Sequence, residues 1–188
     1  MSQDLTRRLQ EGDRNALREI YHAHSSLVYT TALSFVQDEM LAEEVTQDVF
    51  LEAYRSANSF KGNSKLSTWL YRICTNKSLD QIRKKKAQKR SGDTYSINDD
   101  EIGLSIPDFK HPGTELENQE LSQFLFAAID QLNENQKAAF IFSQIDGLPQ
   151  KEISKILEVS IKSVESLIQR AKVNLRKILR VYYEKYKE

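Results

Sequence analysis

The fold of this chain is organised around one stretch, LSTWLYRICTNKSLDQIRKKK, which runs from Leu66 to Lys86. Apolar residues recur in it three and four positions apart, the spacing of one face of an α-helix. We expect this face to enter a hydrophobic core; it comprises Leu66, Trp69, Leu70, Ile73, Leu79 and Ile82. The remaining surface combines cations and an amide with nearby aromatic residues, which suits a single nucleic acid strand. A basic helix end that simply faces solvent is the alternative.

Composition predicts a soluble globular protein of one medium domain or two small ones. The chain has 188 residues, of which 39% are hydrophobic and 29% are charged. No apolar run approaches the about 20 residues that a membrane span needs, and residues 1–4 begin no signal peptide. We therefore expect a cytoplasmic protein without membrane insertion. A single cysteine, Cys74, allows neither a disulfide within one chain nor a thiolate metal framework.

Charge is segregated along the chain although the formal net charge is zero. Residues 1–60, 61–90, 91–136 and 137–188 carry 5, 10, 1 and 11 basic residues against 10, 1, 10 and 6 acidic ones. The net charges of these blocks therefore alternate, at −5, +9, −9 and +5. Such segregation suits a protein that grips nucleic acid in two places and docks on a basic partner elsewhere.

The first 60 residues predict helices, the last of which has an acidic outer row. A short helix over residues 4–11 should end at Gly12, and Asp13 should cap a long one-sided helix. After a break at residues 37–38, a further helix carries carboxylates at i, i+4 and i+8: Glu44, Asp48 and Glu52. Like charges stacked in this way cost a few tenths of a kcal/mol per pair. We therefore favour a docking stripe for a basic partner over a plain solvated face.

A loop over residues 59–65 leads into the central helix, as its Gly, Asn and Ser content indicates. In this loop Phe60 offers a stacking face, and Gly62 lets the backbone approach a ligand closely. Asn63 and Ser64 supply donors and acceptors that can read a base edge.

The second half begins with a linker and ends with a helix-turn-helix pattern. Periodicity stops from Ser91 to Gly113, where two of the three prolines and an excess of acidic residues predict a flexible segment. A capping box at residues 114–117 opens the next helix, and another is expected over residues 134–146. A short helix, a turn at Val159-Ser160 and a longer helix then follow, as in proteins that place a helix in the major groove.

These patterns predict an all-α fold of two small helical domains joined by a flexible acidic linker, the second domain containing the helix-turn-helix. The first domain spans residues 1–90, the linker residues 91–113 and the second domain residues 114–188.

Both halves together resemble the extracytoplasmic-function (ECF) sigma factors of bacterial RNA polymerase. In the first half the resemblance rests on AEEVTQDVF (42–50), FKG (60–62) and STWLYRI (67–73), with Asn76, Asp80 and Arg83. In the second half it rests on QKEIS (150–154), SVES (163–166) and RAK (170–172). The chain departs from common family residues at Ser154, Glu158, Glu165 and Leu167, and the last two make the recognition helix less cationic than usual.

The resemblance implies a sigma factor that binds core polymerase, recognises a promoter and melts its DNA. Polymerase binding, on the coiled coil of the β′ subunit, would fall to Glu44, Gln47, Asp48 and Phe50. The single strand of the minus-ten element would meet Phe60, Lys61, Gly62, Asn63, Ser64, Arg72, Asn76, Arg83 and Lys84. The duplex minus-thirty-five element would meet Lys162, Ser163, Glu165, Ser166, Gln169 and Arg170, and the second domain would sit on the β flap. An anti-sigma factor is a candidate partner, and no cofactor, metal or enzymatic activity is expected.

Two other classes of protein share part of this pattern. A transcriptional regulator would sense a signal with its first domain and touch DNA only with its second, which leaves the basic aromatic helix unexplained. A DNA-acting enzyme such as a recombinase needs a serine, tyrosine or metal constellation, and the sequence shows none. Joining core polymerase and opening a promoter would separate the sigma factor from both.

Overall fold

The computed structural model describes residues 2–92 and 119–185, and the regular elements in these ranges are helices. The first part contains α1 (Ser2–Gln10), α2 (Arg14–Val36), α3 (Glu39–Arg55), a 3-10 turn η1 (Ala57–Ser59) and α4 (Leu66–Gly92). The second contains α5 (Gln119–Asp130), α6 (Glu134–Phe140), a π-helical turn η3 (Ile141–Ile145), α7 (Gln150–Leu157) and α8 (Ile161–Lys185). The all-α prediction is confirmed, and α7 and α8 form the predicted helix-turn-helix. The capping box and most of the predicted linker lie outside the described residues.

Local signals set the helix boundaries in the first part. Gly12 has φ 83°, in the left-handed region that favours glycine after a helix. The Asp13 carboxylate accepts a hydrogen bond from the Asn15 backbone N–H at the start of α2. Gln37 ends that helix with φ 56°, and Asp38 caps α3 by accepting from the Leu41 N–H at 3.1 Å. The predicted break at residues 37–38 is therefore a C-cap followed at once by an N-cap.

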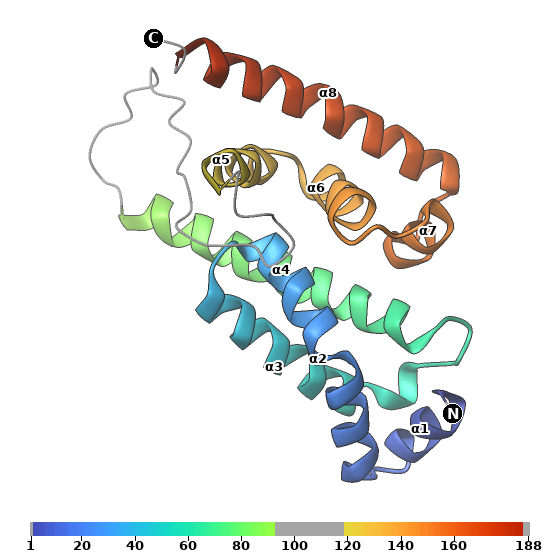
Figure 1. Ribbon diagram of the computed structural model, residues 1–188. Coiled ribbons are helices and arrows are strands. Elements are labelled where there is room, and N and C mark those ends of the chain that lie inside the picture. The colour runs from blue at the N-terminus through green and yellow to red at the C-terminus, as the bar shows by residue number, and fades with distance from the viewer. Residues whose placement is uncertain (1, 93–118, 186–188) are drawn as a thin grey trace.

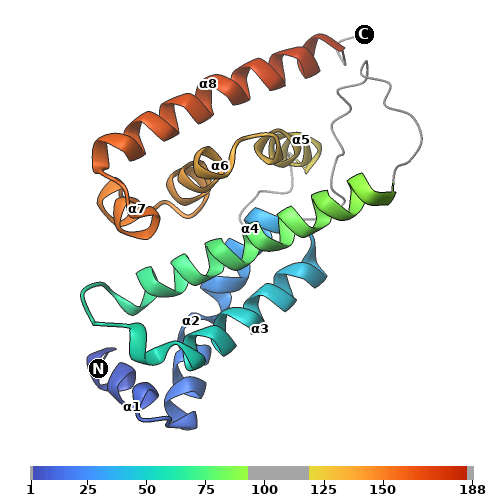
Figure 2. The ribbon, with the colours of Figure 1, turned by 180° about the vertical axis from the view of Figure 1, so that it is seen from behind.

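Helix α4 lies between the other helices of the first part and the second domain (Figures 1 and 2). It packs against α2 and α3 on one side and against α7 on the other. The predicted apolar face is buried at Leu66, Leu70, Ile73 and Leu79, with Trp69 and Ile82 partly buried against the core. The helix continues to Gly92, two residues beyond the predicted domain boundary.

In the second domain, α8 buries one apolar row, formed by Val164, Ile168, Ala171 and Leu175. The helix predicted over residues 134–146 differs, because its last turn is the π-helical η3, in which the Asp146 N–H donates to the Ile141 carbonyl five residues back at 3.0 Å. Ile141 and Phe142 are both fully buried there. In the described residues, no helix combines the length and apolar character that a membrane span requires.

The two domains share a small aromatic core. The Phe142 ring contacts Phe35 of α2 at 5.9 Å between centroids and Tyr71 of α4 at 5.3 Å. Two hydrogen bonds flank it, from Thr31 Oγ1 to Asp146 Oδ2 at 3.3 Å and from Gln37 Nε2 to the Phe126 carbonyl at 2.8 Å. The structure is therefore a closed arrangement of the two domains.

Candidate nucleic-acid interface

A cavity of about 730 Å³ lies where the loop before α4 meets α1. It is lined by Thr6, Arg7, Gln10, Asn58, Phe60, Lys61, Gly62, Asn63, Ser64, Lys65 and Lys155. Four of these residues are cations and none is acidic, so the cavity suits an anionic ligand. Five of the residues predicted to hold the minus-ten strand, Phe60 to Ser64, are brought together here.

The backbone of this loop is positioned by a turn and an aromatic contact. Gly62 has φ 72°, and a Cβ built on it would meet nothing within 4 Å, so glycine is needed for the backbone conformation rather than for space. The Phe60 ring is only 8% exposed because it packs on Trp69, with 4.9 Å between ring centroids. Phe60 therefore holds the loop against α4 and offers a base less stacking surface than its position in the sequence suggests.

Two of the cations predicted to meet the minus-ten strand, Arg72 and Arg83, are paired with the second domain, and so is Lys65 of the cavity. Lys65 Nζ lies 2.5 Å from Glu152 Oε1. Arg72 pairs with Glu158 at 2.7 Å and also donates from Nε and Nη2 to the Lys155 carbonyl. In this conformation carboxylates of the second domain lie where phosphate oxygens are expected.

Arg83 is held in the same way, by Glu134 at the start of α6. Its Nε donates to Glu134 Oε1 at 2.8 Å and its Nη2 to Oε2 at 2.5 Å, with a further bond to Asp80 at 2.8 Å. The hydrogen bond with Glu134 raises the pKa of Arg83 and lowers the pKa of Glu134. Such a two-pronged guanidinium contact is also the geometry that Arg uses on phosphate.

Asn76 and Lys84 lie apart from the loop. Asn76 is exposed on α4 and does not line the cavity; ten residues of helix place it about 15 Å from Leu66. Lys84 lines a second hollow of about 300 Å³ together with Asp48 and Arg83. The cavity thus does not bring Asn76 together with the loop residues that are expected to meet the same strand.

Two carboxylates of the acidic row on α3 contact side chains of α4, one an amide and one a cation. Glu44 Oε1 accepts a hydrogen bond from Gln81 Nε2 at 2.9 Å, and Glu52 pairs with Lys77 at 3.2 Å. Both contacts are exposed or only half-buried, and exposed ion pairs contribute about 0–1 kcal/mol. The row therefore stays accessible to a basic partner.

Other predicted docking residues differ in exposure. Gln47 is exposed and lines a groove of about 380 Å³ between α2 and α3. Phe50 is only 4% exposed, because its ring packs edge-on against Tyr21 at 4.9 Å. Phe50 therefore supports this surface from below instead of offering a contact. Tyr21 and Leu51, exposed at 42% and 49%, are apolar candidates that the sequence pattern did not single out.

The predicted recognition row lies on the solvent face of α8. Lys162, Ser163, Glu165, Gln169 and Arg170 are exposed, and Ser166 is half-buried. The helix begins at a serine cap, where Ser160 Oγ accepts from the Ser163 N–H at 3.1 Å. Just before it, Glu158 has φ 55°, a left-handed conformation that glycine adopts more readily.

Comparisons with known proteins relate both halves of the chain to the same family. The sequence model described as Sigma-70 region 2 matches residues 20–88, and the one described as Sigma-70, region 4 matches residues 125–175. The ECF RNA polymerase sigma factor SigW of Bacillus subtilis is 30% identical, over 93% of this chain and 94% of the relative. The ECF RNA polymerase sigma-E factor of Escherichia coli K12 is also 30% identical, over 90% of each chain.

Two solved structures share the fold at 22% identity. The chain aligned from the complex of CnrH with the cytosolic domain of CnrY has a TM-score of 0.65, with 96% of this chain and 97% of that one covered. The chain aligned from the complex of the sigma factor RpoE with the anti-sigma factor NepR of Bartonella quintana has a TM-score of 0.62, with 87% and 96% covered.

Proposed function

Because the chain belongs to the ECF group of bacterial RNA polymerase sigma factors, we propose that it binds core polymerase and opens promoter DNA with the surfaces described above. Its role in transcription initiation requires no catalysed reaction, and the chain is not an enzyme. We propose that the chain has the three parts predicted from its sequence. Residues 1–90 bind core polymerase and melt DNA, residues 91–113 form the linker, and residues 114–188 recognise the upstream element.

The observation that carries this proposal is the cationic cavity at the loop before α4. A base extruded from the duplex costs a few kcal/mol of stacking and pairing, which contacts made only with the open strand must offset. Asn63 and Ser64 provide polar groups for a base edge, and Lys61 and Lys65 provide charge for the adjoining phosphates. Melting is then driven by binding energy alone.

The remaining surfaces are assigned by charge and exposure. The row of Glu44 and Asp48, with Gln47 in the adjoining groove, is proposed to dock on the β′ coiled coil. The exposed face of α8, centred on Gln169 and Arg170, is proposed to read the minus-thirty-five element in the major groove, with the second domain on the β flap.

This function requires the two domains to separate. By their names, the minus-ten and minus-thirty-five elements lie about 25 base pairs apart, or about 85 Å of duplex at 3.4 Å per base pair. In the closed conformation Arg72 of α4 is only 2.7 Å from Glu158, next to the recognition helix. One closed molecule cannot reach both elements at once, so we propose that the arrangement opens on polymerase.

The energetics of the closed contact are consistent with such opening. The ion pairs of Lys65, Arg72 and Arg83 lie at the surface, where solvent screening makes the contribution of an ion pair to stability small. Burial of the Phe142 ring contributes at most about 1.5–3 kcal/mol to closure, the value for burying the whole side chain. Polymerase and DNA contacts can therefore exceed the free energy of closure, and DNA phosphates can replace the carboxylates on the same cations.

An anti-sigma factor is a further proposed partner. Both of the solved structures named above are complexes, one with NepR and one with the cytosolic domain of CnrY. A protein that stabilised the closed arrangement would keep Lys65, Arg72 and Arg83 paired with carboxylates of the second domain. Such a partner should slow binding to core polymerase, which a competition assay measures directly.

The proposal is tested by reconstitution with bacterial core polymerase and a library of genomic fragments. We expect the chain to join core, select a set of promoters and produce permanganate-reactive thymines at their minus-ten elements. The Asn63→Ala variant should still bind core but open these promoters less. A chain that binds DNA without joining core would instead be a transcriptional regulator, and the proposal would be rejected.

A further inference from the structure

We infer that α1 completes the single-strand cavity and that Gln10 is the residue that positions its loop. This inference rests on the proposed function, since the cavity must receive a strand for the loop position to matter. The region 2 sequence model begins to match at residue 20, so α1 (Ser2–Gln10) lies outside the part of the chain that this model matches.

Gln10 is joined to both ends of the turn that leads into the loop. Its Nε2 donates to the Ala57 carbonyl at 3.1 Å and to the Phe60 carbonyl at 2.9 Å. An amide nitrogen has two hydrogens, so this one side chain can satisfy both acceptors. Phe60 in turn packs on Trp69, so the amide holds the Phe60 backbone while the ring contact holds its side chain.

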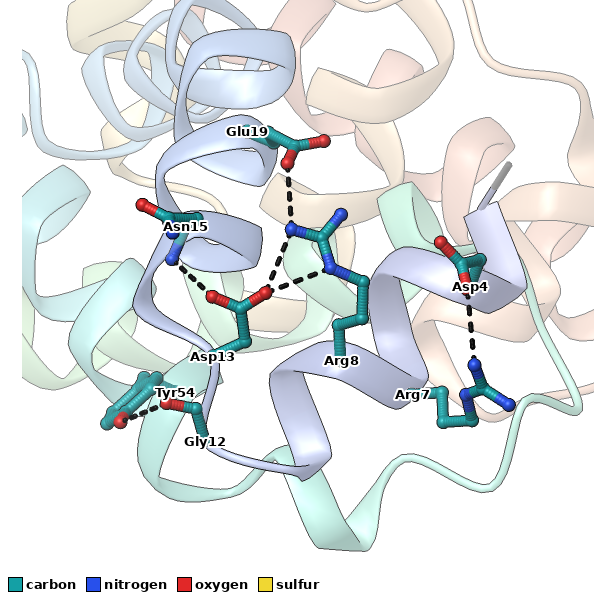
Figure 3. A network of polar contacts seen from close by, with 8 residues as sticks. All are labelled: Asp4, Arg7, Arg8, Gly12, Asp13, Asn15, Glu19 and Tyr54. Atoms are coloured by element: carbon teal, nitrogen blue, oxygen red, sulfur yellow. Dashed lines mark hydrogen bonds and ion pairs between the residues drawn. The ribbon is translucent and has the colours of Figure 1, made fainter.

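Helix α1 is itself fixed to the body of the first domain, as Figure 3 shows. Arg8 bridges Asp13 at 2.8 Å and Glu19 at 3.0 Å, and thereby ties α1 to the start of α2. The Tyr54 hydroxyl of α3 donates to the Gly12 carbonyl at 3.2 Å. Leu9, beside Gln10, is 1% exposed and packs in the core. Gln10 therefore acts from a rigid support, which is what a positioning residue requires.

The same face of α1 adds a cation to the cavity. Arg7 lies three residues before Gln10, and positions i and i+3 share one helix face. Its partners Asp4 and Glu11 are distant, at 3.6 and 3.8 Å, and its side chain is 70% exposed. The guanidinium is thus accessible to an anion. With Lys61 and Lys65 across the cavity, it suits the phosphate beside an extruded nucleotide.

The test compares Gln10→Met, which keeps the length of the side chain but removes its donors, with Gln131→Met as the matched control. Gln131 is exposed in the turn after α5, in the other domain. Each variant is assembled with core polymerase and titrated with single-stranded oligonucleotides of the non-template minus-ten strand. One series is intact and the other carries an abasic site at each position in turn.

In the wild type, one abasic position should weaken binding about tenfold, and this position marks the base held in the cavity. Gln10→Met should bind the intact strand about tenfold more weakly, as the loss of two hydrogen bonds of modest net strength implies. Removing the base at the marked position should weaken the binding of Gln10→Met little further, because the pocket for that base is already impaired. Gln131→Met should match the wild type throughout.

The tryptophan of the chain reports on the loop separately. Trp69 is the single tryptophan, and it packs on Phe60. In the full chain without polymerase, Gln10→Met should increase quenching of Trp69 emission by acrylamide, while far-ultraviolet circular dichroism stays unchanged. Unaltered quenching together with an unaltered abasic profile would overturn the inference.

Arg7→Gln separates the charge of α1 from its positioning role. This variant should weaken binding by the same factor on intact and abasic strands. The slope of log affinity against log salt concentration should fall by the amount that corresponds to about one phosphate contact. If Gln10→Met also loses affinity equally on every strand, Gln10 does not position the loop. If the wild type shows no abasic effect and opens no promoter, the proposed function fails instead.

Discussion

We expect Asp146→Asn to stabilise the closed arrangement, with an effect that depends on pH. Asp146 ends the η3 turn and is half-buried against the first domain, where it accepts a hydrogen bond from Thr31. Burial raises the pKa of this carboxyl from 3.8 to about 6, although the bond from Thr31 acts in the opposite direction. The ionised form is therefore disfavoured in the closed state.

The sign of the effect follows from this raised pKa. Below about pH 4 the carboxyl is protonated in both the closed and the unfolded state and has no effect on stability. As pH rises through 6 it ionises, and the closed state loses at most about 3 kcal/mol, the equivalent of about two pKa units. At pH 5 the loss is about half as large. Tyr71 and Cys74, whose pKa values are raised by burial and by Asp146, stay neutral over this range.

The Asn variant cannot ionise and can still accept the bond from Thr31, so it should be more stable than the wild type by up to about 3 kcal/mol at pH 8 and by about half of that at pH 5. The measurement is urea unfolding at both pH values, with fluorescent labels on α3 and α8 that report separation of the domains. Glu165→Gln, an exposed carboxylate on α8, is the matched control and should show no such trend. Equal pH dependence in the Asn variant and the wild type would refute the reasoning.

Three further predictions concern the proposed interfaces. Asp48→Lys should weaken binding to core polymerase without changing the far-ultraviolet circular dichroism; unaltered affinity would reject the docking surface. Gln169→Ala should cost about 1–3 kcal/mol of promoter binding and relax preference at one upstream position, whereas an equal loss on every sequence would indicate a phosphate contact. Glu158→Gly should stabilise the second domain by about 1 kcal/mol, because it removes a non-glycine residue from a left-handed conformation. The same variant loses the ion pair between Arg72 and Glu158, so its affinity for single-stranded DNA should increase. Urea unfolding and strand titration measure the two effects, and a less stable variant would contradict the first.

Features set by neighbours in the chain could be predicted from the sequence. The cap at Asp13, the break at residues 37–38, the apolar face of α4 and the row on α8 all follow from spacing and side-chain type within one or two turns. The loop over residues 59–65 could be located for the same reason, because its glycine and small polar residues interrupt the helices. These local signals also carry the resemblance to sigma factors.

Contacts between distant residues were decided only by the tertiary structure. Gln10 reaches Phe60 across 50 positions and Arg72 reaches Lys155 across 83, and no local pattern specifies such partners. Phe50 illustrates the limit: its helix was correctly predicted, but the packing of Tyr21 decides that its ring is buried. Helical periodicity fixes which residues share a face, whereas the element that covers the face depends on how the helices pack. A cation on an exposed face can pair with any carboxylate that the fold brings near, so the sequence indicated where charge lies and the structure decided what it meets.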